Sequence, residues 1–150
     1  MSLKIQLLTA VTEAFPAPIT APPAGFTGPV NGEILSAADS RWVEMPGYWQ
    51  SSTDADGFAL RFLDPGNNGF RRITYFAKRA TIWHPNFGAA NTYHIYLDGE
   101  FYAHVNVNPG VAGASTEVVA ASIGQHAIEM RVVASDGHYA LVERIAFVNN

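Results

Sequence analysis

Residues 91–108, NTYHIYLDGEFYAHVNVN, decide the fold of this chain. Two runs rich in β-branched and aromatic residues flank Asp98-Gly99, and this dipeptide between alternating strands is a strong signal of a β-hairpin. A two-residue loop would mix apolar and polar side chains on both faces. A three-residue loop, Leu97-Asp98-Gly99 with a left-handed Gly99 in a bulge, shifts the pairing by one residue and gives one coherent apolar face. We therefore predict the three-residue loop.

The predicted register sorts the side chains of the hairpin onto two faces. The apolar face carries Tyr93, Ile95, Phe101, Ala103, Val105 and Val107, and the opposite face carries His94, Tyr96, Glu100, Tyr102, His104 and Asn106. A face of aromatic and imidazole groups is commonly an ordinary exposed or neighbour-packed surface. It also suits a binding or subunit-contact surface, for which the candidates are His94, Tyr96, Tyr102 and His104. His94 and His104 could pair on a metal, although a cross-strand histidine pair is more commonly a plain sheet contact.

The rest of the chain from residue 32 onward has the same character as the hairpin. Runs of alternating apolar and polar residues, such as 58–63 and 126–133, are separated by turn clusters such as DPGNNG at 64–69. No apolar period of 3.6 residues extends beyond two turns. Nine or ten short strands with regularly spaced turns predict an all-β antiparallel sandwich or barrel.

The N-terminal segment differs in composition. Residues 1–14 favour a strand over a short helix because of their β-branched residues. The following segment, FPAPITAPPAGFTGPVNG at 15–32, is rich in proline, which donates no backbone hydrogen bond and therefore indicates an extended arm. We divide the chain into an N-terminal strand and proline-rich arm over 1–31 and a β-sandwich domain over 32–150. An ordered arm must be held by its own domain or by a neighbouring subunit.

Composition argues against several classes of function. The net charge is −4 with 15% charged residues, which does not suggest a nucleic-acid binder. The one basic cluster, Arg71, Arg72, Lys78 and Arg79, fits strand ends that face solvent. The absence of cysteine excludes disulfides and thiolate chemistry, and no apolar run approaches the roughly 18 residues of a membrane span.

Catalytic motifs are also missing from the sequence. There is no Gly-x-Ser-x-Gly elbow and no phosphate loop, and the five histidines are scattered. The pair Asp39-Ser40 lacks a preceding glycine, so it does not match the Gly-Asp-Ser context of an esterase nucleophile. A nucleophile needs a base and an orienting acid near it, and we therefore predict that the chain is not an enzyme.

Three stretches resemble a known family. They are YHIYLDGEFYAHV at 93–105, ASIGQHAIEMRVV at 121–133 and YALVERIAFV at 139–148. From about Gly69 to Val148 their order is similar to that of the galactose-binding-domain-like jelly rolls, which include carbohydrate-binding modules and the non-catalytic β-domain of some esterases. The resemblance implies an antiparallel jelly-roll sandwich. Because these are core and turn patterns, they specify the fold better than the function.

The resemblance also implies candidate sites. In sugar-binding members, exposed aromatic rings stack on sugars, and the matching residues here are Trp42, Tyr48, Trp49, Trp83, His84, Asn86 and Phe87. Trp83 is preferred because Pro85 ends its strand at a loop mouth, although a tryptophan at a loop edge is more often half-buried core. Several members hold calcium between the first and last strands, which implies Glu33 and Glu143 as ligands, with Asp54 and Asp56 as alternatives. Glu143 could equally form a salt bridge to Arg131 or Arg144. No other cofactor is expected.

Two functions fit these observations. The first is a structural or adhesive module of a larger assembly, such as a phage head-decoration or tail protein, with the arm contacting other subunits and a glycan-binding surface. The opening LLTAVT is similar to the start of small phage structural proteins. Such a protein would be found in a virion or outside the cell. The alternative is a free-standing carbohydrate-binding module or the accessory β-domain of a carbohydrate esterase.

Overall fold

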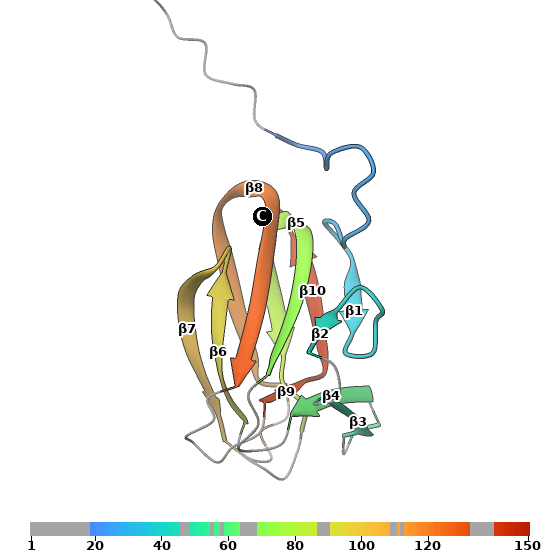
Figure 1. The fold of residues 1–150 in the computed structure, drawn as a ribbon, viewed down its shortest axis with the longest axis vertical. Helices are drawn as coiled ribbons and strands as arrows, with labels where there is room; N and C mark the ends of the chain where they lie inside the picture. Colours follow the sequence, from blue (N-terminus) through green and yellow to red (C-terminus); the bar gives the residue numbers. More distant parts are fainter. Residues whose placement is uncertain are drawn as a thin grey trace, which may run out of the picture.

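The protein is described here by a computed structural model that covers residues 19–45, 49–54, 56–57, 59–63, 69–86, 91–108, 111, 113–132 and 140–150. Ten strands and no helix occur in these residues (Figure 1). The strands are β1 (Ile34–Ser36), β2 (Val43–Glu44), β3 (Gln50–Thr53), β4 (Ala59–Leu63), β5 (Phe70–Trp83), β6 (Asn91–Leu97), β7 (Glu100–Val107), β8 (Ser115–Val132), β9 (Ala140–Val142) and β10 (Arg144–Val148). Within this part of the chain, no helix could cross a membrane.

Two long strands, β5 and β8, build both layers of the sandwich. Both bend over at the top of Figure 1 and return on the other side. Residues 70–77 of β5 pair with 124–131 of β8, whereas residues 79–83 pair with 115–119. Residues 70–77 of β5 and 124–132 of β8 join β2, β6 and β7 in what we call the hairpin layer. Residues 79–83 of β5 and 115–119 of β8 join β1 and β10 in the closing layer. A small sheet of β3, β4 and β9 completes the fold.

A bulge in β5 keeps the core continuous around this bend. The β5–β8 register shifts between Ala77 and Arg79. Before the shift the buried positions are odd-numbered, as in Ile73 and Tyr75, and after it they are even-numbered, as in Ala80 and Ile82. An extra residue in one strand reverses which side chains face inward. Tyr75 therefore packs on Phe147 of β10, with ring centroids 4.9 Å apart.

The β6–β7 hairpin has a different turn from the predicted one. Leu97 pairs with Glu100, so the loop has two residues, Asp98 and Gly99, with φ angles of 53° and 90°. Two consecutive positive φ angles define a type I′ turn, whose twist matches that of the strands. The register then shifts between Tyr96 and Ile95, so Ile95 pairs with Ala103 and not, as the predicted loop would require, with Phe101. The side chains from Ile95 outward nevertheless lie on the predicted faces.

This shift changes the placement of one predicted core residue. The prediction put Phe101 on the apolar face, but its side chain is 58% exposed. Phe101 pairs with Tyr96 and its ring lies 5.3 Å from that of His94. The bulge sits between the turn and the regular part of the hairpin, so the residues nearest the turn follow the two-residue register that the prediction rejected.

The described end of the arm packs on its own domain. The Phe76 amide donates to the Pro29 carbonyl over 2.9 Å, and Val30 forms a parallel bridge with Phe76. The ring of Phe26 meets that of Phe76 edge-on at 6.3 Å. This cover leaves Phe76 only 3% exposed, although its side chain points away from the core. The predicted strand over 1–14 lies outside the described residues.

Candidate functional site

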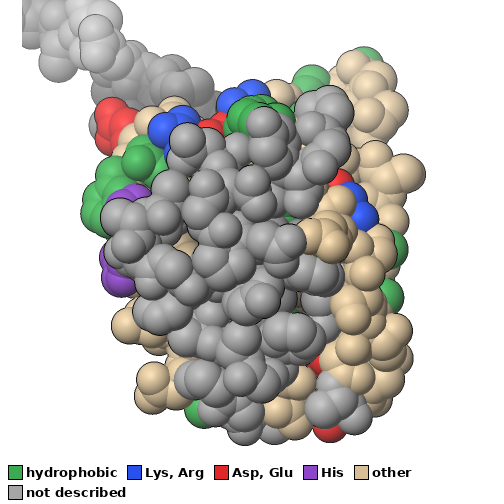
Figure 2. Space-filling view, turned by 60° about the horizontal axis from the view of Figure 1, so that its bottom comes forward, with side chains coloured by type: hydrophobic (Ala, Val, Ile, Leu, Met, Phe, Trp, Pro, Cys, Tyr) green, Lys and Arg blue, Asp and Glu red, His purple; other side chains and the backbone are tan. Residues whose placement is uncertain are grey.

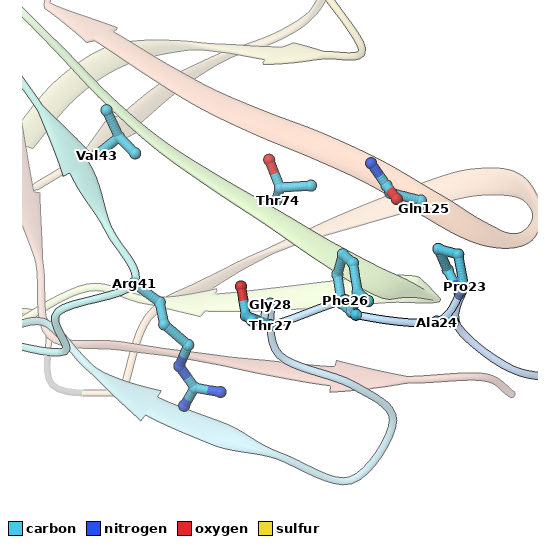
Figure 3. A pocket seen from close by; sticks show the side chains of 10 residues that line it. Pro23, Ala24, Phe26, Thr27, Gly28, Arg41, Val43, Thr74 and Gln125 are labelled. Carbon is cyan, nitrogen blue, oxygen red and sulfur yellow. The ribbon is translucent and has the colours of Figure 1, made fainter.

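Two depressions that meet at Thr74 lie on the outer face of the hairpin layer, and together we call them the sheet groove. One part, of about 500 Å³, lies between the arm and strands β5 and β8 (Figure 3). A second part, of about 440 Å³, continues from Thr74 toward the Asp98-Gly99 turn. The first part is lined by Pro23, Ala24, Gly25, Phe26, Thr27, Gly28, Arg41, Val43, Thr74 and Gln125. The second is lined by Arg72, Thr74, Asp98, Gly99, Ala127, Glu129 and Arg131.

Strand pairing arranges the groove's side chains in rows. Residues that pair across a sheet point to the same side. One row runs from Arg72 through Glu129 and Tyr96 to Phe101. The next row runs from Phe70 through Arg131 and His94 to His104. Charged groups of β5 and β8 therefore lie beside aromatic groups of β6 and β7 on one rigid face.

Two arginines share one carboxylate in the groove. Arg72 Nε donates to Glu129 Oε2 over 2.8 Å, and Arg131 Nε donates to Glu129 Oε1. Burial would raise the pKa of Glu129, but hydrogen bonds from Arg131 and Arg72 outweigh it and lower the pKa. The carboxylate therefore stays ionised and holds both guanidinium groups in position.

An aromatic cluster adjoins the arginines. We give this name to His94, Tyr96, Phe101 and His104. The His94 ring lies 5.1 Å from that of His104 and 5.3 Å from that of Phe101, while Tyr96 and Phe101 are 5.9 Å apart. Histidine and hydrophobic side chains lie next to one another along the left edge of Figure 2. The structure thus brings together three of the four predicted surface residues and adds Phe101.

The fourth predicted surface residue, Tyr102, has a separate role. It follows Phe101 at the register shift, and its hydroxyl accepts a hydrogen bond from the Val119 amide over 3.1 Å. Val119 belongs to the half of β8 in the closing layer. Tyr102 therefore links the free edges of the two layers, while its side chain stays partly exposed.

Two of the predicted glycan-stacking tryptophans are part of the core. Trp42 and Trp49 are each 7% exposed. Their indole nitrogens donate to the carbonyls of Ser36 over 3.2 Å and Phe70 over 2.9 Å. The guanidinium of Arg71 lies 4.1 Å from the centre of the Trp42 ring. These rings bind a buried arginine, so the prediction that they are exposed platforms is wrong.

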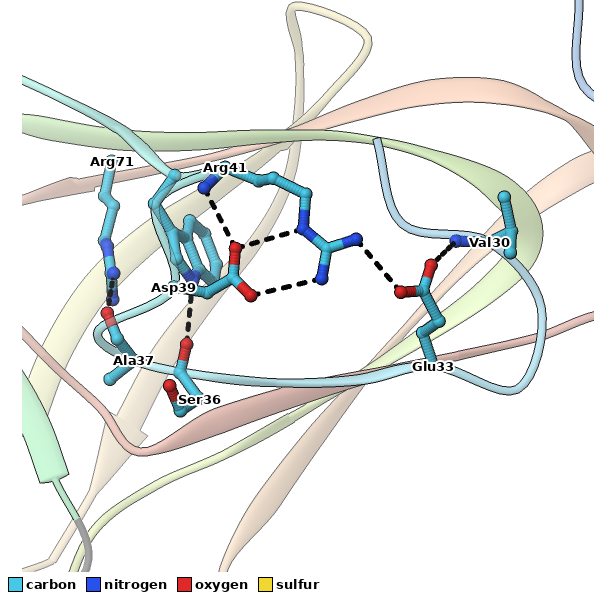
Figure 4. Close-up of polar contacts among 8 residues, drawn as sticks. Val30, Glu33, Ser36, Ala37, Asp39, Arg41 and Arg71 are labelled. Atoms are coloured by element: carbon cyan, nitrogen blue, oxygen red, sulfur yellow. Dashed lines mark hydrogen bonds and ion pairs between the residues drawn. The ribbon is translucent and has the colours of Figure 1, made fainter. Parts of the chain in front are cut away.

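One member of the basic cluster, Arg71, is placed differently from the prediction. Arg71 is only 1% exposed and donates to the Ala37 carbonyl (Figure 4), rather than facing solvent. Its Nε lies 2.9 Å from an oxygen of Glu44, which also binds Arg61. Burial lowers the pKa of Arg71 to about 9. The sequence offers one signal for this burial, because Arg71 shares the odd-numbered phase of Ile73.

The loop-mouth candidates have mixed outcomes. His84 is fully buried, with Nε2 2.9 Å from Thr116 Oγ1 and Nδ1 3.3 Å from the Tyr93 hydroxyl. It is therefore a core histidine and does not face the predicted loop mouth. Trp83 is half-buried, and the Arg144 guanidinium lies 4.9 Å from its ring centre. Asn86 is also half-buried. For Trp83 and Asn86 a glycan contact stays a prediction. The other two candidates, Tyr48 and Phe87, lie outside the described residues.

The two predicted calcium ligands, Glu33 and Glu143, contact different partners. The Glu33 carbonyl accepts from the Phe147 amide, while the Glu143 carbonyl accepts from the Ala37 amide. These contacts are four residues apart along β1 and β10, or about 13 Å at 3.3 Å per residue. Glu33 instead receives hydrogen bonds from Val30 over 2.6 Å and from Arg41 over 3.0 Å (Figure 4). These contacts give no support to a shared calcium site, which stays a prediction.

Glu143 forms the predicted salt bridge to Arg144, with Nε and Oε1 3.0 Å apart. Burial raises the pKa of Glu143, and the charges of Asp54 and Asp56 raise it further against the effect of Arg144. Across the described part of the chain, no three histidine or acidic side chains are arranged to hold a metal ion.

Comparison with known proteins identifies the fold. No protein-family model matches the sequence, and no curated protein matches it. A family 35 carbohydrate-binding module from Clostridium thermocellum superposes with a TM-score of 0.60 and 11% identity, covering 77% of this chain and 98% of that one. A family 6 module from Clostridium stercorarium, solved in complex with cellobiose, gives a TM-score of 0.55 and 12% identity, covering 82% and 98%.

Two further structures extend the comparison. The CBM36-1 domain of a multidomain xylanase from the hindgut metagenome of Trinervitermes trinervoides gives a TM-score of 0.54 and 20% identity, covering 75% and 93%. A family two carbohydrate esterase from Cellvibrio japonicus gives a TM-score of 0.55 and 11% identity, covering 79% of this chain and 33% of the esterase. The chain has the galactose-binding-like jelly-roll fold of these modules, as the three sequence stretches predicted.

Proposed function

We propose that this chain is a non-catalytic carbohydrate-binding module and that its glycan lies in the sheet groove. The observation that carries the proposal is the combination of an open groove, polar side chains and an exposed aromatic cluster on one rigid sheet face. Thr74 and Gln125 lie on neighbouring strands opposite the arm (Figure 3). Such side chains can hydrogen-bond sugar hydroxyls, while aromatic rings cover the apolar face of a sugar.

The non-catalytic part of the proposal rests on the histidine that most resembles a catalytic base. His126 Nδ1 lies 2.7 Å from Asp98 Oδ2, a pairing typical of an activated histidine. Its Nε2, however, lies 3.0 Å from the backbone carbonyl of Ser122. Because both ring nitrogens have structural partners, the pair fixes the hairpin turn against β8 and leaves no nitrogen for a nucleophile.

The test is a titration of the full chain with neutral plant and bacterial oligosaccharides, followed by NMR and calorimetry. Tyr96→Ala and Phe101→Ala should weaken binding about threefold to tenfold, the value of one aromatic contact. Ile34→Ala is the matched control, because Ile34 is 64% exposed on the closing layer. If Trp83→Ala abolishes binding while both groove variants bind normally, the site lies at the loop end. If no glycan binds, the proposed function fails.

We further propose that the N-terminal arm contacts other subunits of a larger assembly, such as a phage-type virion. The protein would then act in a virion or outside the cell. The supporting observation is the exposed start of the described arm, where Ile19 is 66% exposed. Light scattering should give an oligomer for the full chain and a monomer for a chain that begins at Ile19. Equal masses for the two chains would remove the support for this role.

A further inference from the structure

The sheet groove contains two exposed arginines that binding of a neutral glycan does not require. Arg72 and Arg131 both pair with Glu129, and in the described residues neither pairs with another carboxylate. The two arginine side chains are 48% and 46% exposed, whereas that of Glu129 is 9% exposed. Two accessible cations therefore flank one covered anion, in a chain whose overall charge is −4.

Both guanidinium groups are held in place before any ligand arrives. The Arg131 guanidinium lies 3.9 Å from the centre of the Tyr96 ring, and that of Arg72 lies 5.4 Å from the centre of the Phe70 ring. Each is also fixed by Glu129. Stacking and ion pairing remove much of the rotamer freedom that an exposed arginine would otherwise lose on binding. The pair is thus preorganised at the floor of the groove.

The other acidic group that lines this part of the groove is already occupied. Asp98 Oδ1 accepts from the Ala127 amide over 2.8 Å, and Oδ2 lies 2.7 Å from His126 Nδ1. Ala127 is two residues from Glu129 along β8, or about 7 Å. Asp98 therefore lies about two residues from Glu129 along the sheet, and the arginine pair lies in the rows that also hold the aromatic cluster.

We propose, building on the function proposed above, that the glycan is acidic and that Arg72 and Arg131 bind the carboxylate of a uronic-acid residue. The planar guanidinium fork matches the two oxygens of a carboxylate. The aromatic cluster lies on the same face next to Arg131 and would cover the neighbouring sugar ring. Glu129 acts as a positioning residue, because it orients both arginines without contacting the ligand.

The test compares three ligands of equal length on the full chain: a neutral oligosaccharide, the same backbone carrying a uronic acid, and a sulfated one. Calorimetry should show the uronic-acid ligand binding roughly tenfold or more tightly than the neutral one, the value of one hydrogen bond to a charged group. Arg131→Gln should remove this preference. Arg131→Lys, which keeps the charge but loses the planar fork, should retain only part of it.

Arg79→Gln is the matched control, since it removes an arginine from β5 that pairs with Glu117 in the closing layer. Arg72→Gln provides a second variant if Arg131→Gln unfolds, and thermal melting checks both. Equal affinity for neutral and uronic-acid ligands would overturn this inference while leaving glycan binding intact. A preference for the sulfated ligand would overturn the carboxylate assignment. Binding of none of the three would overturn the proposed function itself.

Discussion

Gly28→Ala is the sharpest test of whether the arm belongs to the folded domain. Gly28 passes so close to β5 that an added Cβ would lie 2.3 Å from the Thr74 carbonyl oxygen and 2.5 Å from the Phe26 ring. Side-chain Cβ atoms essentially never approach other atoms closer than 3.0 Å. The Thr74 carbonyl belongs to a long paired strand and cannot yield, so the arm must retreat by about 0.7 Å or more.

The structure gives the size of the effect. The same retreat would stretch the 2.9 Å bond from the Phe76 amide to Pro29 beyond hydrogen-bonding distance, at a cost of about 1 kcal/mol. The edge-on contact between Phe26 and Phe76 would weaken as well, which costs roughly another 0.5–1.5 kcal/mol. Alanine restricts the unfolded chain more than glycine does, and this offsets about 0.4–1 kcal/mol. We expect a net loss of about 0.5–2 kcal/mol in the free energy of unfolding.

Urea unfolding followed by tryptophan fluorescence measures this loss, and hydrogen exchange at the Phe76 amide locates it. Gly124→Ala is the control, because its Cβ would meet no atom closer than the 3.4 Å to the His126 ring. We expect faster exchange at Phe76 in Gly28→Ala and unchanged exchange at Phe76 in the control. An unchanged free energy together with a still-protected Phe76 amide would refute the close packing of the arm on β5.

Three further predictions concern ionisable groups. Glu143→Gln should raise the melting temperature at pH 7, because burial and nearby negative charge raise the pKa of Glu143 and make its ionisation unfavourable. The gain should shrink toward pH 4, where Glu143 becomes protonated. A lower melting temperature of the variant at pH 7 would contradict the prediction. The pKa values of Glu33, Asp39 and Glu129 are lowered in the folded protein, so these carboxylates contribute stability above about pH 4.5. Urea unfolding should show that this stability is lost as the pH falls toward 3. A free energy of unfolding that does not change over this pH range would contradict the prediction. Arg71→Ala should cost about 3–5 kcal/mol in urea unfolding, because it empties a buried ion pair, and a loss below about 1 kcal/mol would show that the pair is dispensable.

The sequence was sufficient for the parts of the fold that depend on local chemistry. Asp98-Gly99 tolerates positive φ angles, so the position of the β6–β7 turn followed directly from the dipeptide. The alternation of residues 126–132 likewise identified the second half of β8. The sequence predicts one closing strand over 139–148, which the structure divides into β9 and β10, and Ile145 and Phe147 of β10 are fully buried.

The sequence was not sufficient where tertiary packing decides between alternatives that are locally equal. From the sequence, residues 72–77 and 80–83 are predicted to be two separate strands. They form one bent strand that contains a bulge. The hairpin turn presented the same problem, because the predicted loop and the observed turn with a bulge put the same side chains on the same faces from Ile95 outward, although their pairings differ by two residues. The alternation of apolar and polar residues shows where the buried positions change from odd to even numbers. It does not show whether a bulge within one strand or a loop between two strands causes the change.

The candidate site shows the same division. The face that carries His94, Tyr96 and His104 could be predicted, because it depends on alternation within one hairpin. The arginine pair could not, since Arg72 and Arg131 meet at Glu129 only through the register between β5 and β8. That register joins residues 57 positions apart, and no local pattern encodes it.

The packing of the arm changes how its role in assembly can be tested. A chain shortened to begin at Gly32 would lose Phe26, Pro29 and Val30, and thereby uncover Phe76. It would also lose the amide of Val30 that binds the carboxylate of Glu33. A change of mass in such a chain would mix lost subunit contacts with a newly exposed apolar ring, which itself promotes association. Cutting at Ile19 keeps these contacts, so only that comparison separates an assembly device from a piece of the domain's own surface.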